Sequence, residues 1–246
     1  MIFWPSCENN LIRFYSVPHV RNYIKRQLQL ELLGEVPVLS IRTEPLQNPV
    51  NRLAKRLFDL TFSSLFLLTI FPFIYLFVGL IIKITSPGPI FFKQERNGEN
   101  GKIFKCYKFR SMKVNALSDS LQATKNDPRK TKFGNFLRKS NLDELPQFIN
   151  VFKGEMSIVG PRPHMLKHTE EYSQLINKYM MRHLVKPGIT GWAQVTGYRG
   201  ETKELSQMEG RVRRDLWYIE NWTFLLDIRI MIKTVTNMFR GEKNAY

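Results

Sequence analysis

Two adjacent carboxylates, Asp143 and Glu144, are the side chains in this sequence best placed to do chemistry. Ser140 or Asn141 could cap a helix that begins just before them, and Pro146 is tolerated only near the start of a helix. Adjacent helical residues point about 100° apart, so we expect the two carboxylates to perform different tasks. One could attack phosphorus to form an acyl phosphate while the other binds a metal ion, and the positive end of the helix would keep both ionised. The alternative is a capping box formed by Asn141 and Glu144.

Two other segments carry residue types that recognise phosphate. In Gly160-Pro161-Arg162-Pro163 the arginine stands between two prolines with fixed φ angles, which holds the direction of its guanidinium and suits bidentate phosphate binding. Residues 186–192 form a glycine turn whose backbone amides could cradle phosphate, although a type II turn before a strand explains the same residues. A proline-flanked arginine is also ordinary in surface turns, so neither segment identifies a function by itself.

Metal clusters, disulfide scaffolds and Walker-type ATP hydrolysis find no support. His164 and His168 have the i, i+4 spacing of metal ligands, but no third ligand accompanies them, and we expect them on a solvated helix face. The phosphate-loop patterns G-x-x-x-x-G-K-[ST] and G-x-G-x-x-G do not occur. Cys7 and Cys106 belong to no CxxC or Cys/His cluster, which excludes the disulfide-scaffold and zinc-finger classes and favours a reducing environment.

The charge balance indicates anionic partners. The 246 residues include 37 Lys and Arg against 21 Asp and Glu, which gives a net charge of +16. Such a surface attracts nucleic acid, anionic lipid or phosphorylated substrates, and the basic residues are densest over residues 105–139. A hydrophobic share of 43% beside 24% charged residues indicates a folded protein with one membrane segment at most.

Residues 60–82 are that candidate membrane segment. They form a run of 23 uncharged residues rich in Leu, Ile and Phe, and as a helix they would extend about 35 Å. Pro72 lies near the middle and predicts a kink or break, because it removes a backbone hydrogen bond. Basic residues flank both ends, whereas a crossing segment usually has one flank poor in Lys and Arg. We expect a re-entrant helix-break-helix that leaves Met1 and Tyr246 in the cytosol; the alternative is an ordinary kinked transmembrane helix.

The rest of the chain divides around this segment. Residues 1–51 resemble a short polar lead or linker, residues 52–84 form the re-entrant membrane helix, and residues 85–246 form a cytosolic domain continuous with it. The expected elements of the lead are a helix over 22–33 and a strand over 36–41. Beyond the membrane segment we expect a β-hairpin with strands over 90–92 and 103–109 around a turn at 97–101, and helices over 142–152, 165–184, 205–218 and 224–239. The expected fold class is α+β and predominantly helical.

Taken in order, the motifs of residues 52–240 resemble those of the bacterial monotopic phosphoglycosyl transferases, the bacterial sugar transferases that start exopolysaccharide, capsule, O-antigen and glycoprotein glycan assembly. Six motifs in the right order make the resemblance specific. They are Lys55-Arg56-Leu57-Phe58-Asp59, Ser86-Pro87-Gly88-Pro89-Ile90-Phe91-Phe92-Lys93-Gln94, Tyr107-Lys108-Phe109-Arg110-Ser111-Met112, Leu142-Asp143-Glu144-Leu145-Pro146-Gln147, Gly154-Glu155-Met156-Ser157-Ile158-Val159-Gly160-Pro161-Arg162-Pro163 and Lys186-Pro187-Gly188-Ile189-Thr190-Gly191-Trp192-Ala193-Gln194.

The resemblance implies a reaction and a set of roles. The reaction is transfer of a sugar-1-phosphate from a nucleoside diphosphate sugar, expected to be a UDP-hexose, to polyprenyl phosphate such as undecaprenyl phosphate. It would use Mg²⁺, release UMP and take place at the cytosolic face of the bacterial inner membrane. Asp143 corresponds to the nucleophile and Glu144 to its partner carboxylate, and both are expected metal ligands. The expected substrate-binding residues are Lys108, Arg110, Arg138, Pro161, Arg162 and Pro163, all in the catalytic domain over 85–246.

Two features depart from the family pattern. The family often has Ser-Pro at the helix break, and this chain has Phe71-Pro72, so a hydroxyl that could satisfy a freed carbonyl is absent. Longer members carry transmembrane helices and a nucleotide-fold regulatory domain ahead of the catalytic part. Residues 35–46 resemble the tail of that region, so we expect residues 1–51 to be its remnant and regulation by it not to apply.

Two other functions stay open on the sequence. A membrane-anchored nucleic-acid-binding protein would explain the basic stretch over 105–139 but not the carboxylate pair, and its signature would be salt-dependent duplex binding. A multi-span polyisoprenyl-phosphate transferase would need more than one apolar run. On the preferred interpretation the partners are the nucleotide sugar, polyprenyl phosphate and membrane lipid, with no nucleic acid, and a homo-oligomer is compatible with the sequence.

Overall fold

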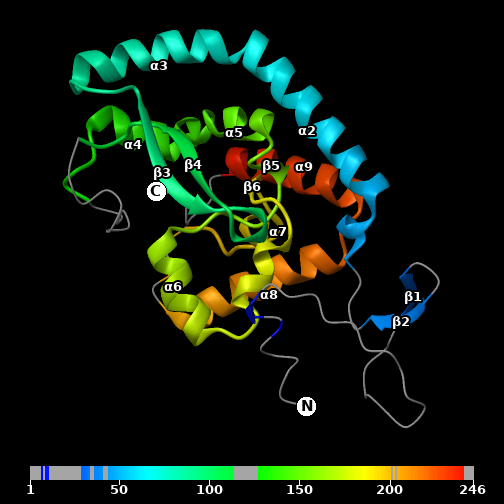
Figure 1. The fold of residues 1–246 in the computed structure, drawn as a ribbon. Coiled ribbons are helices and arrows are strands. Elements are labelled where there is room, and N and C mark those ends of the chain that lie inside the picture. Colours follow the sequence, from blue (N-terminus) through cyan, green and yellow to red (C-terminus); the bar gives the residue numbers. More distant parts are fainter. Residues whose placement is uncertain are drawn as a thin grey trace.

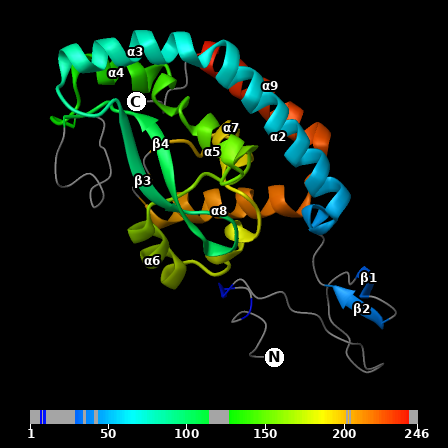
Figure 2. The ribbon, with the colours of Figure 1, turned by 45° about the horizontal axis from the view of Figure 1, so that its top comes forward.

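A bent pair of long helices forms an arch over the rest of the protein (Figure 1, Figure 2). The computed structural model describes residues 7, 9–10, 29–33, 36–40, 44–113, 127–200, 202 and 204–240. Helix α2 covers Pro49–Thr69 and begins at Asn48, whose side chain accepts a hydrogen bond from the Val50 amide. Helix α3 covers Phe71–Thr85, and the two helix axes differ by 56°. The predicted break near Pro72 is confirmed, because proline has no amide hydrogen to continue the α2 ladder.

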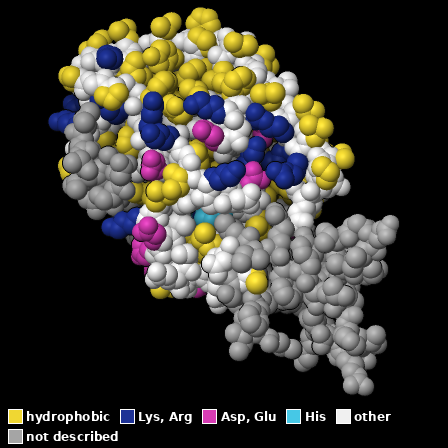
Figure 3. Space-filling view, in the orientation of Figure 1, with side chains coloured by type: hydrophobic (Ala, Val, Ile, Leu, Met, Phe, Trp, Pro, Cys, Tyr) yellow, Lys and Arg dark blue, Asp and Glu magenta, His cyan; other side chains and the backbone are white. Residues whose placement is uncertain are grey.

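The outer surface of this arch is apolar. Large apolar side chains on α2 and α3 are between 44% and 79% exposed, and Figure 3 shows them covering the upper rim with a band of Lys and Arg below it. These side chains are Val50, Leu53, Leu57, Phe62, Leu65, Leu68, Phe73, Leu76, Phe77, Leu80 and Ile84. Within the described residues, no helix taken singly has the length and apolar character to cross a membrane, but α2 and α3 together satisfy both criteria. An exposed apolar area of this extent marks a surface that contacts a partner or a membrane.

An antiparallel hairpin lies beneath the arch. Strand β3 covers Phe91–Asn97 and strand β4 covers Ile103–Phe109, with Phe91 opposite Phe109 and the short helix η2, Glu99–Gly101, at the turn. The predicted hairpin is confirmed, but β3 runs five residues beyond the predicted strand. Its apolar run stops at Phe92, and the polar residues that follow pair with β4 all the same.

Two predicted helices are each broken in the structure. The pattern over 142–152 contains the short helix η3, Leu142–Glu144, and a separate α5, Gln147–Lys153. The pattern over 165–184 contains α6, Leu166–Leu175, and η4, Tyr179–Leu184, separated where Lys178 adopts a φ of 67°. Helix α4, Lys132–Lys139, lies just before η3. The predicted C-terminal helices are confirmed as α8, Leu205–Glu220, and α9, Phe224–Arg240.

Two short parallel strands bring the proline-arginine segment beside the glycine turn. Strand β5 covers Ser157–Val159 and strand β6 covers Gly188–Thr190, followed by α7, Trp192–Val195. The backbones approach so closely that a Cβ atom on Gly188 would lie 2.1 Å from the Gly160 nitrogen. The glycine turn therefore leads into a strand, as one of its two interpretations expected.

The N-terminal lead holds one more hairpin. Strands β1, Gln29–Leu33, and β2, Val36–Ser40, pair antiparallel, and η1 covers Pro45–Gln47. The predicted strand over 36–41 is confirmed, whereas the predicted helix over 22–33 is wrong at residues 29–33 and lies outside the described residues at 22–28. The described chain is predominantly helical with small sheets, as the predicted fold class states.

The inner face of α2 is held by polar contacts. The Asp59 carboxylate accepts hydrogen bonds from the Ser157 hydroxyl, at 3.1 Å, and from the Ile158 amide, at 3.0 Å, so it fixes β5 to the helix. One turn earlier, the Lys55 ammonium lies 2.5 Å from an Asp227 carboxylate oxygen. Tyr218 and Trp222 also donate to Asp227, at 2.8 and 3.0 Å, which joins α2 to α8 and α9. Lys55, Asp59 and Asp227 each therefore have a partner for their buried charge.

Asp227→Ala removes the acceptor shared by Lys55, Tyr218 and Trp222. We expect the free energy of unfolding to fall by about 3–5 kcal/mol, because a buried ammonium loses its partner. Thermal or denaturant unfolding in detergent measures the change. Glu170→Ala, on an exposed position of α6, is the control and should change stability by less than about 0.5 kcal/mol. An Asp227→Ala protein as stable as the wild type would show that this network does not hold α2 in place.

Candidate active site

The two carboxylates lie in a tight turn between α4 and α5. Thr131 caps α4 by accepting a hydrogen bond from the Gly134 amide, and the helix ends at Lys139. Asn141 then adopts the left-handed conformation, with a φ of 59°, and the chain turns into η3 with Asp143 and Glu144. The alternative of a capping box is wrong, because the Asn141 side chain makes no capping hydrogen bond and accepts from Arg199 instead.

Glu144 is held by two cations from different parts of the chain. Arg162 binds it with two nitrogens, Nη1 at 2.9 Å from Oε2 and Nη2 against Oε1. Lys108 Nζ, from β4, lies 2.7 Å from Oε1. Burial disfavours the ionised carboxylate, but Arg162 and Lys108 outweigh it and hold the pKa of Glu144 well below its usual value. Glu144 is therefore a fixed anion.

Asp143 has the opposite character. Its side chain is buried, and within the described part of the chain no ion pair ties its carboxylate. Burial and the neighbouring charge of Glu144 raise its pKa to about 6, although Lys108, Arg138 and Arg162 act to lower it. Burial therefore outweighs any stabilisation of the Asp143 charge by the helix terminus. A carboxylate with this pKa is mostly ionised at neutral pH yet poorly solvated, which favours its action as a nucleophile or base.

Three of the expected substrate-binding cations face this pair. Arg138 comes from the last turn of α4 and is steadied by the Ser111 hydroxyl, 2.8 Å from its Nε. Lys108 comes from β4, and Arg162 follows β5. Charges converging from three elements suit an oligophosphate, which needs several donors around it.

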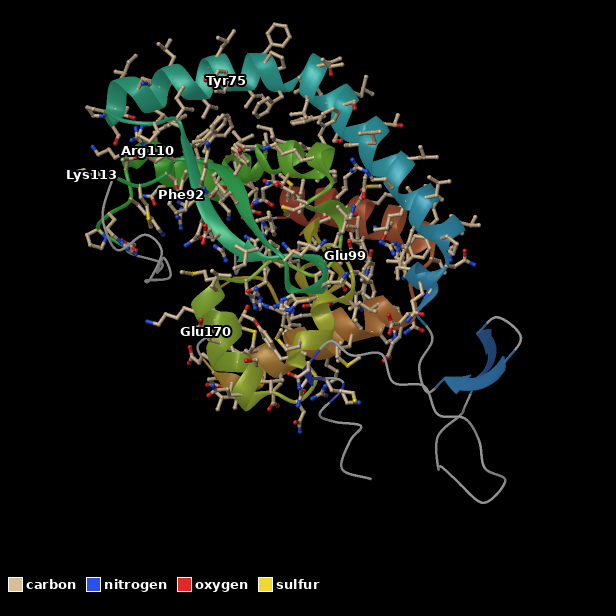
Figure 4. The ribbon with its side chains drawn as sticks, in the orientation of Figure 1. Tyr75, Phe92, Glu99, Arg110, Lys113 and Glu170 are labelled. Carbon is tan, nitrogen blue, oxygen red and sulfur yellow. The ribbon has the colours of Figure 1, made fainter. Side chains whose placement is uncertain are left out.

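The remaining expected residues lie elsewhere or act through their backbone. Arg110 is not brought to the carboxylates: its guanidinium donates to the carbonyls of Ser86 and Pro87, at the end of α3, where Figure 4 places it. The Pro161 carbonyl accepts from the Gly188 amide at 2.9 Å, and the Pro163 carbonyl from Arg96 at 3.4 Å. Both prolines therefore hold the loop that carries the arginine.

His164 and His168 do not form the predicted solvated face. His164 is buried and His168 half-buried, and burial, the largest cause, lowers the pKa of both below the usual value. Helix α6 begins at Leu166, so His164 lies before the helix and the two histidines do not share a helix face. Of the basic stretch over 105–139, residues 114–126 lie outside the described residues.

Comparison with known proteins places the chain in a family. Residues 50–241 match the family described as bacterial sugar transferase. The chain belongs to this family. It is 52% identical over 233 residues to a protein of Escherichia coli (strain K12) and 47% identical over 237 residues to one of Xanthomonas campestris pv. campestris, both named UDP-glucose:undecaprenyl-phosphate glucose-1-phosphate transferase. The expected family is thus confirmed.

The coverage of these relatives differs. Each of the two alignments includes 94% of this chain but only 49% and 48% of the relative, so the chain spans about half of their length. A shorter relative is matched almost in full: the exopolysaccharide production protein PSS of Rhizobium leguminosarum bv. phaseoli is 45% identical over 194 residues, 76% of this chain and 96% of its own. The described carboxylate turn and arginine loop lie inside the matched region of the bacterial sugar transferase family.

The carboxylates also define where a divalent cation would bind in this bacterial sugar transferase. Among the described residues, no three His, Cys, Asp or Glu side chains gather into a metal cluster. Mg²⁺, however, is often bound by one or two carboxylates together with substrate phosphates. Asp143 supplies a carboxylate without an ion pair, so the donor set fits Mg²⁺ when a phosphorylated ligand completes it, and Glu144 could join only by giving up a contact with Lys108 or Arg162.

Sequence reasoning missed two residues that assemble the site. Asn150 of α5 accepts from the Tyr107 amide at 3.0 Å and donates to the Lys105 carbonyl at 2.8 Å, which fixes β4, and so Lys108, against the helix. An asparagine inside an apolar helical run was the available signal, because buried polar residues need partners. Arg199, which contacts Asn141, gave no signal, since 58 residues separate them.

The pKa of Asp143 is raised and that of Glu144 is lowered, so removal of the two charges should change the stability of the protein in opposite directions. Asp143→Asn should raise the free energy of unfolding above pH 6, by on the order of 2–3 kcal/mol, because the folded state no longer holds a poorly solvated carboxylate. The gain should disappear towards pH 4, near the usual pKa of 3.8. Glu144→Gln should lower stability above the usual pKa of 4.5, and the difference should shrink as the pH falls. Unfolding of the unliganded protein from about pH 4 to 8 measures both, and effects of the same sign at neutral pH would contradict the assignment.

Proposed function

We propose that this chain transfers a sugar-1-phosphate from a UDP-sugar to undecaprenyl phosphate. The observation that carries the proposal is the pairing of a buried carboxylate of raised pKa, Asp143, with a fixed anion, Glu144, under three phosphate-binding cations. The names of the relatives that cover most of the chain support this reaction class. The cations that face the carboxylates account for part of the basic stretch, so binding of nucleic acid is not needed to explain it.

The proposed reaction has two steps. An Asp143 oxygen attacks the phosphorus that bears the sugar; an acyl phosphate bond forms, the bond to the bridging oxygen breaks, and UMP leaves with the electron pair. An oxygen of the lipid phosphate then attacks the same phosphorus and releases the Asp143 carboxylate, giving polyprenyl diphosphate sugar. Arg138 and Arg162 stabilise charge on the phosphate oxygens in both steps. Lys108 binds Glu144 and so helps to hold the carboxylate that positions Arg162.

Mg²⁺ is part of this proposal. Asp143 would hold it together with the phosphates of the substrate, and bound there it would withdraw charge from the phosphate oxygens and stabilise the departing UMP. Asp143 cannot be both a tight ligand and the attacking group through the same oxygen. Asp143 would therefore attack through the oxygen that does not hold the cation.

The sugar is proposed to be glucose. The relatives at 47% to 52% identity are named for UDP-glucose, whereas the relative named for UDP-N-acetylgalactosamine, from Aeromonas hydrophila, is 35% identical over 231 residues. The product would then start an exopolysaccharide or a related surface glycan.

The membrane surface is the proposed location. The apolar rim of α2 and α3 fits the acyl region of one leaflet, and the Lys and Arg band below it in Figure 3 fits the headgroups. One substrate is a lipid and the other a polyanion in water, so the site beneath the arch would meet both. We place the chain at the cytosolic face of the bacterial inner membrane as a re-entrant protein; Met1 and Tyr246, the termini expected in the cytosol, lie outside the described residues.

Purified protein in detergent or nanodiscs tests the reaction. Incubation with UDP-[¹⁴C]glucose, undecaprenyl phosphate and Mg²⁺ should give radiolabelled lipid and an equal amount of UMP. UDP-galactose and the UDP-N-acetylhexosamines, offered separately, report the sugar preference. Failure with every nucleotide sugar would overturn the function, whereas a preference for an N-acetyl sugar would overturn only the assignment of glucose.

Asp143→Asn should abolish turnover. The substitution removes the attacking oxygen while nearly keeping the volume, so kcat should fall by about four orders of magnitude or more with no loss of folding. With UDP-glucose and no lipid, the wild-type peptide containing Asp143 should gain the mass of a hexose phosphate and the variant should not. An active Asp143→Asn protein without any adduct would leave only direct transfer between the two substrates.

A charge on the apolar rim should release the chain from membranes. Leu76→Lys places an ammonium at a position of α3 that is 67% exposed, where burial in lipid would cost about 2.5–3.5 kcal/mol. Flotation with liposomes should show a smaller bound fraction. Gln174→Lys, on an exposed position of α6, adds the same charge and should float like the wild type. Equal flotation of all three proteins would argue against insertion of α3.

A further inference from the structure

Another buried ion pair, between Arg182 and Asp215, adjoins the backbone of Arg162. Arg182, in η4, and Asp215, in α8, have side chains that are 1% and 2% exposed. Arg182 Nη2 lies 2.7 Å from Asp215 Oδ2, and Nε lies 3.2 Å from the same oxygen. Neither residue contacts the carboxylates of the proposed reaction, so the mechanism above leaves this pair unexplained.

The guanidinium of Arg182 reaches both sides of Pro163. Its Nη2 donates to the backbone carbonyl of Arg162 at 2.8 Å, and its Nη1 lies 2.5 Å from Nδ1 of His164. The two residues contacted are therefore the ones immediately before and after the proline. A planar group with fixed donor directions that holds both neighbours also holds the orientation of the segment between them.

The contact with His164 fixes the state of that histidine. A guanidinium only donates, so Nδ1 must accept and the imidazole is neutral with its proton on Nε2. Nε2 is buried and has no partner among the described residues. His164 therefore serves as an acceptor for Arg182, and Tyr179, whose hydroxyl lies 2.6 Å from Nδ1, packs beside it.

We infer that Arg182 is a positioning residue that aims Arg162 at Glu144 and at the substrate phosphates. Asp215 neutralises Arg182 and anchors it to α8, Arg182 fixes the carbonyl of Arg162 and the ring of His164, and the Arg162 side chain then leaves the loop in one direction. The Arg162 guanidinium must keep this orientation to bind both carboxylate oxygens of Glu144 at once, because a bidentate pair is planar. This inference rests on the proposed function, in which Arg162 binds phosphate.

A double-mutant cycle separates positioning from general stability. Arg182→Lys keeps the charge beside Asp215, but a single ammonium cannot span the three acceptors, and a misplaced Arg162 should lower kcat/KM for UDP-glucose by about 100-fold. In an Arg162→Ala background the same change should cost less than about twofold, because the side chain that it positions is gone. If Arg182→Lys does not fold, Asp215→Asn takes its place, because it keeps the shape of the side chain but removes its charge. It should likewise lower kcat/KM strongly when Arg162 is present and only slightly in the Arg162→Ala background.

A core substitution provides the matched control. Ile230→Val removes one buried methylene from α9, far along the chain from both arginines, and any loss that it causes should be the same with and without Arg162→Ala. Losses from Arg182→Lys that persist fully in the Arg162→Ala background would overturn the inference and leave a structural ion pair. Wild-type protein without transferase activity would instead remove the proposed function, so the two failures are distinguishable.

Discussion

The attachment of α2 to the interior is the constraint on which the rest of the structure depends. Many apolar side chains of α2 are exposed and do not attach the helix to the rest of the protein. The residues on its inner face must therefore make the contacts that hold it in place. Aromatic packing, such as Phe66 on Phe148 with ring centroids 4.3 Å apart, supplies part of them. Lys55 and Asp59 add directional bonds. Buried charges of this kind stabilise only when each is paired, and such pairing also fixes the rotation of the helix about its axis.

Short series of contacts connect α2 to the carboxylate turn that holds Asp143 and Glu144. Asp59 binds the amide of Ile158 in β5, and four residues later the chain reaches Arg162, which grips Glu144. On the other side, Asn150 ties α5 to β4, which presents Lys108 to the same carboxylate. The anion at the centre of the site is thus held from two sides, and both sides are anchored to elements that pack against the arch. In the proposed reaction, the position of the α2–α3 arch and the position of the groups around the phosphorus atom are therefore coupled.

The sequence predicted the elements that have a clear pattern of apolar residues. It did not predict the ends of elements that depend on the backbone conformation of one or two residues. The long apolar run with Pro72, the hairpin and the two C-terminal helices follow from composition and spacing. The breaks inside two predicted helices do not: η3 and α5 are separated at Leu145 and Pro146, and α6 and η4 are separated where Lys178 adopts a positive φ angle. The carboxylates and Arg162 could be found from motifs, but their pairing could not. Arg182 could not be found at all, since its partners are distant in sequence and an arginine in a helical pattern usually indicates an exposed position.

The close approach of β5 and β6 imposes a steric requirement that is separate from the proposed chemistry. A Cβ atom on Gly160 would lie 2.5 Å from the Lys186 carbonyl oxygen, and one on Gly188 would meet the Gly160 nitrogen, so both positions exclude every other residue type on steric grounds. Both glycines lie within the residues that match the bacterial sugar transferase family, yet neither has a side chain that could take part in the proposed reaction. Under the proposed mechanism, a relative that kept both glycines but lost Asp143 would keep this close strand packing without the proposed reaction. The glycines therefore carry a requirement of the fold, whereas the proposed reaction depends on the carboxylate.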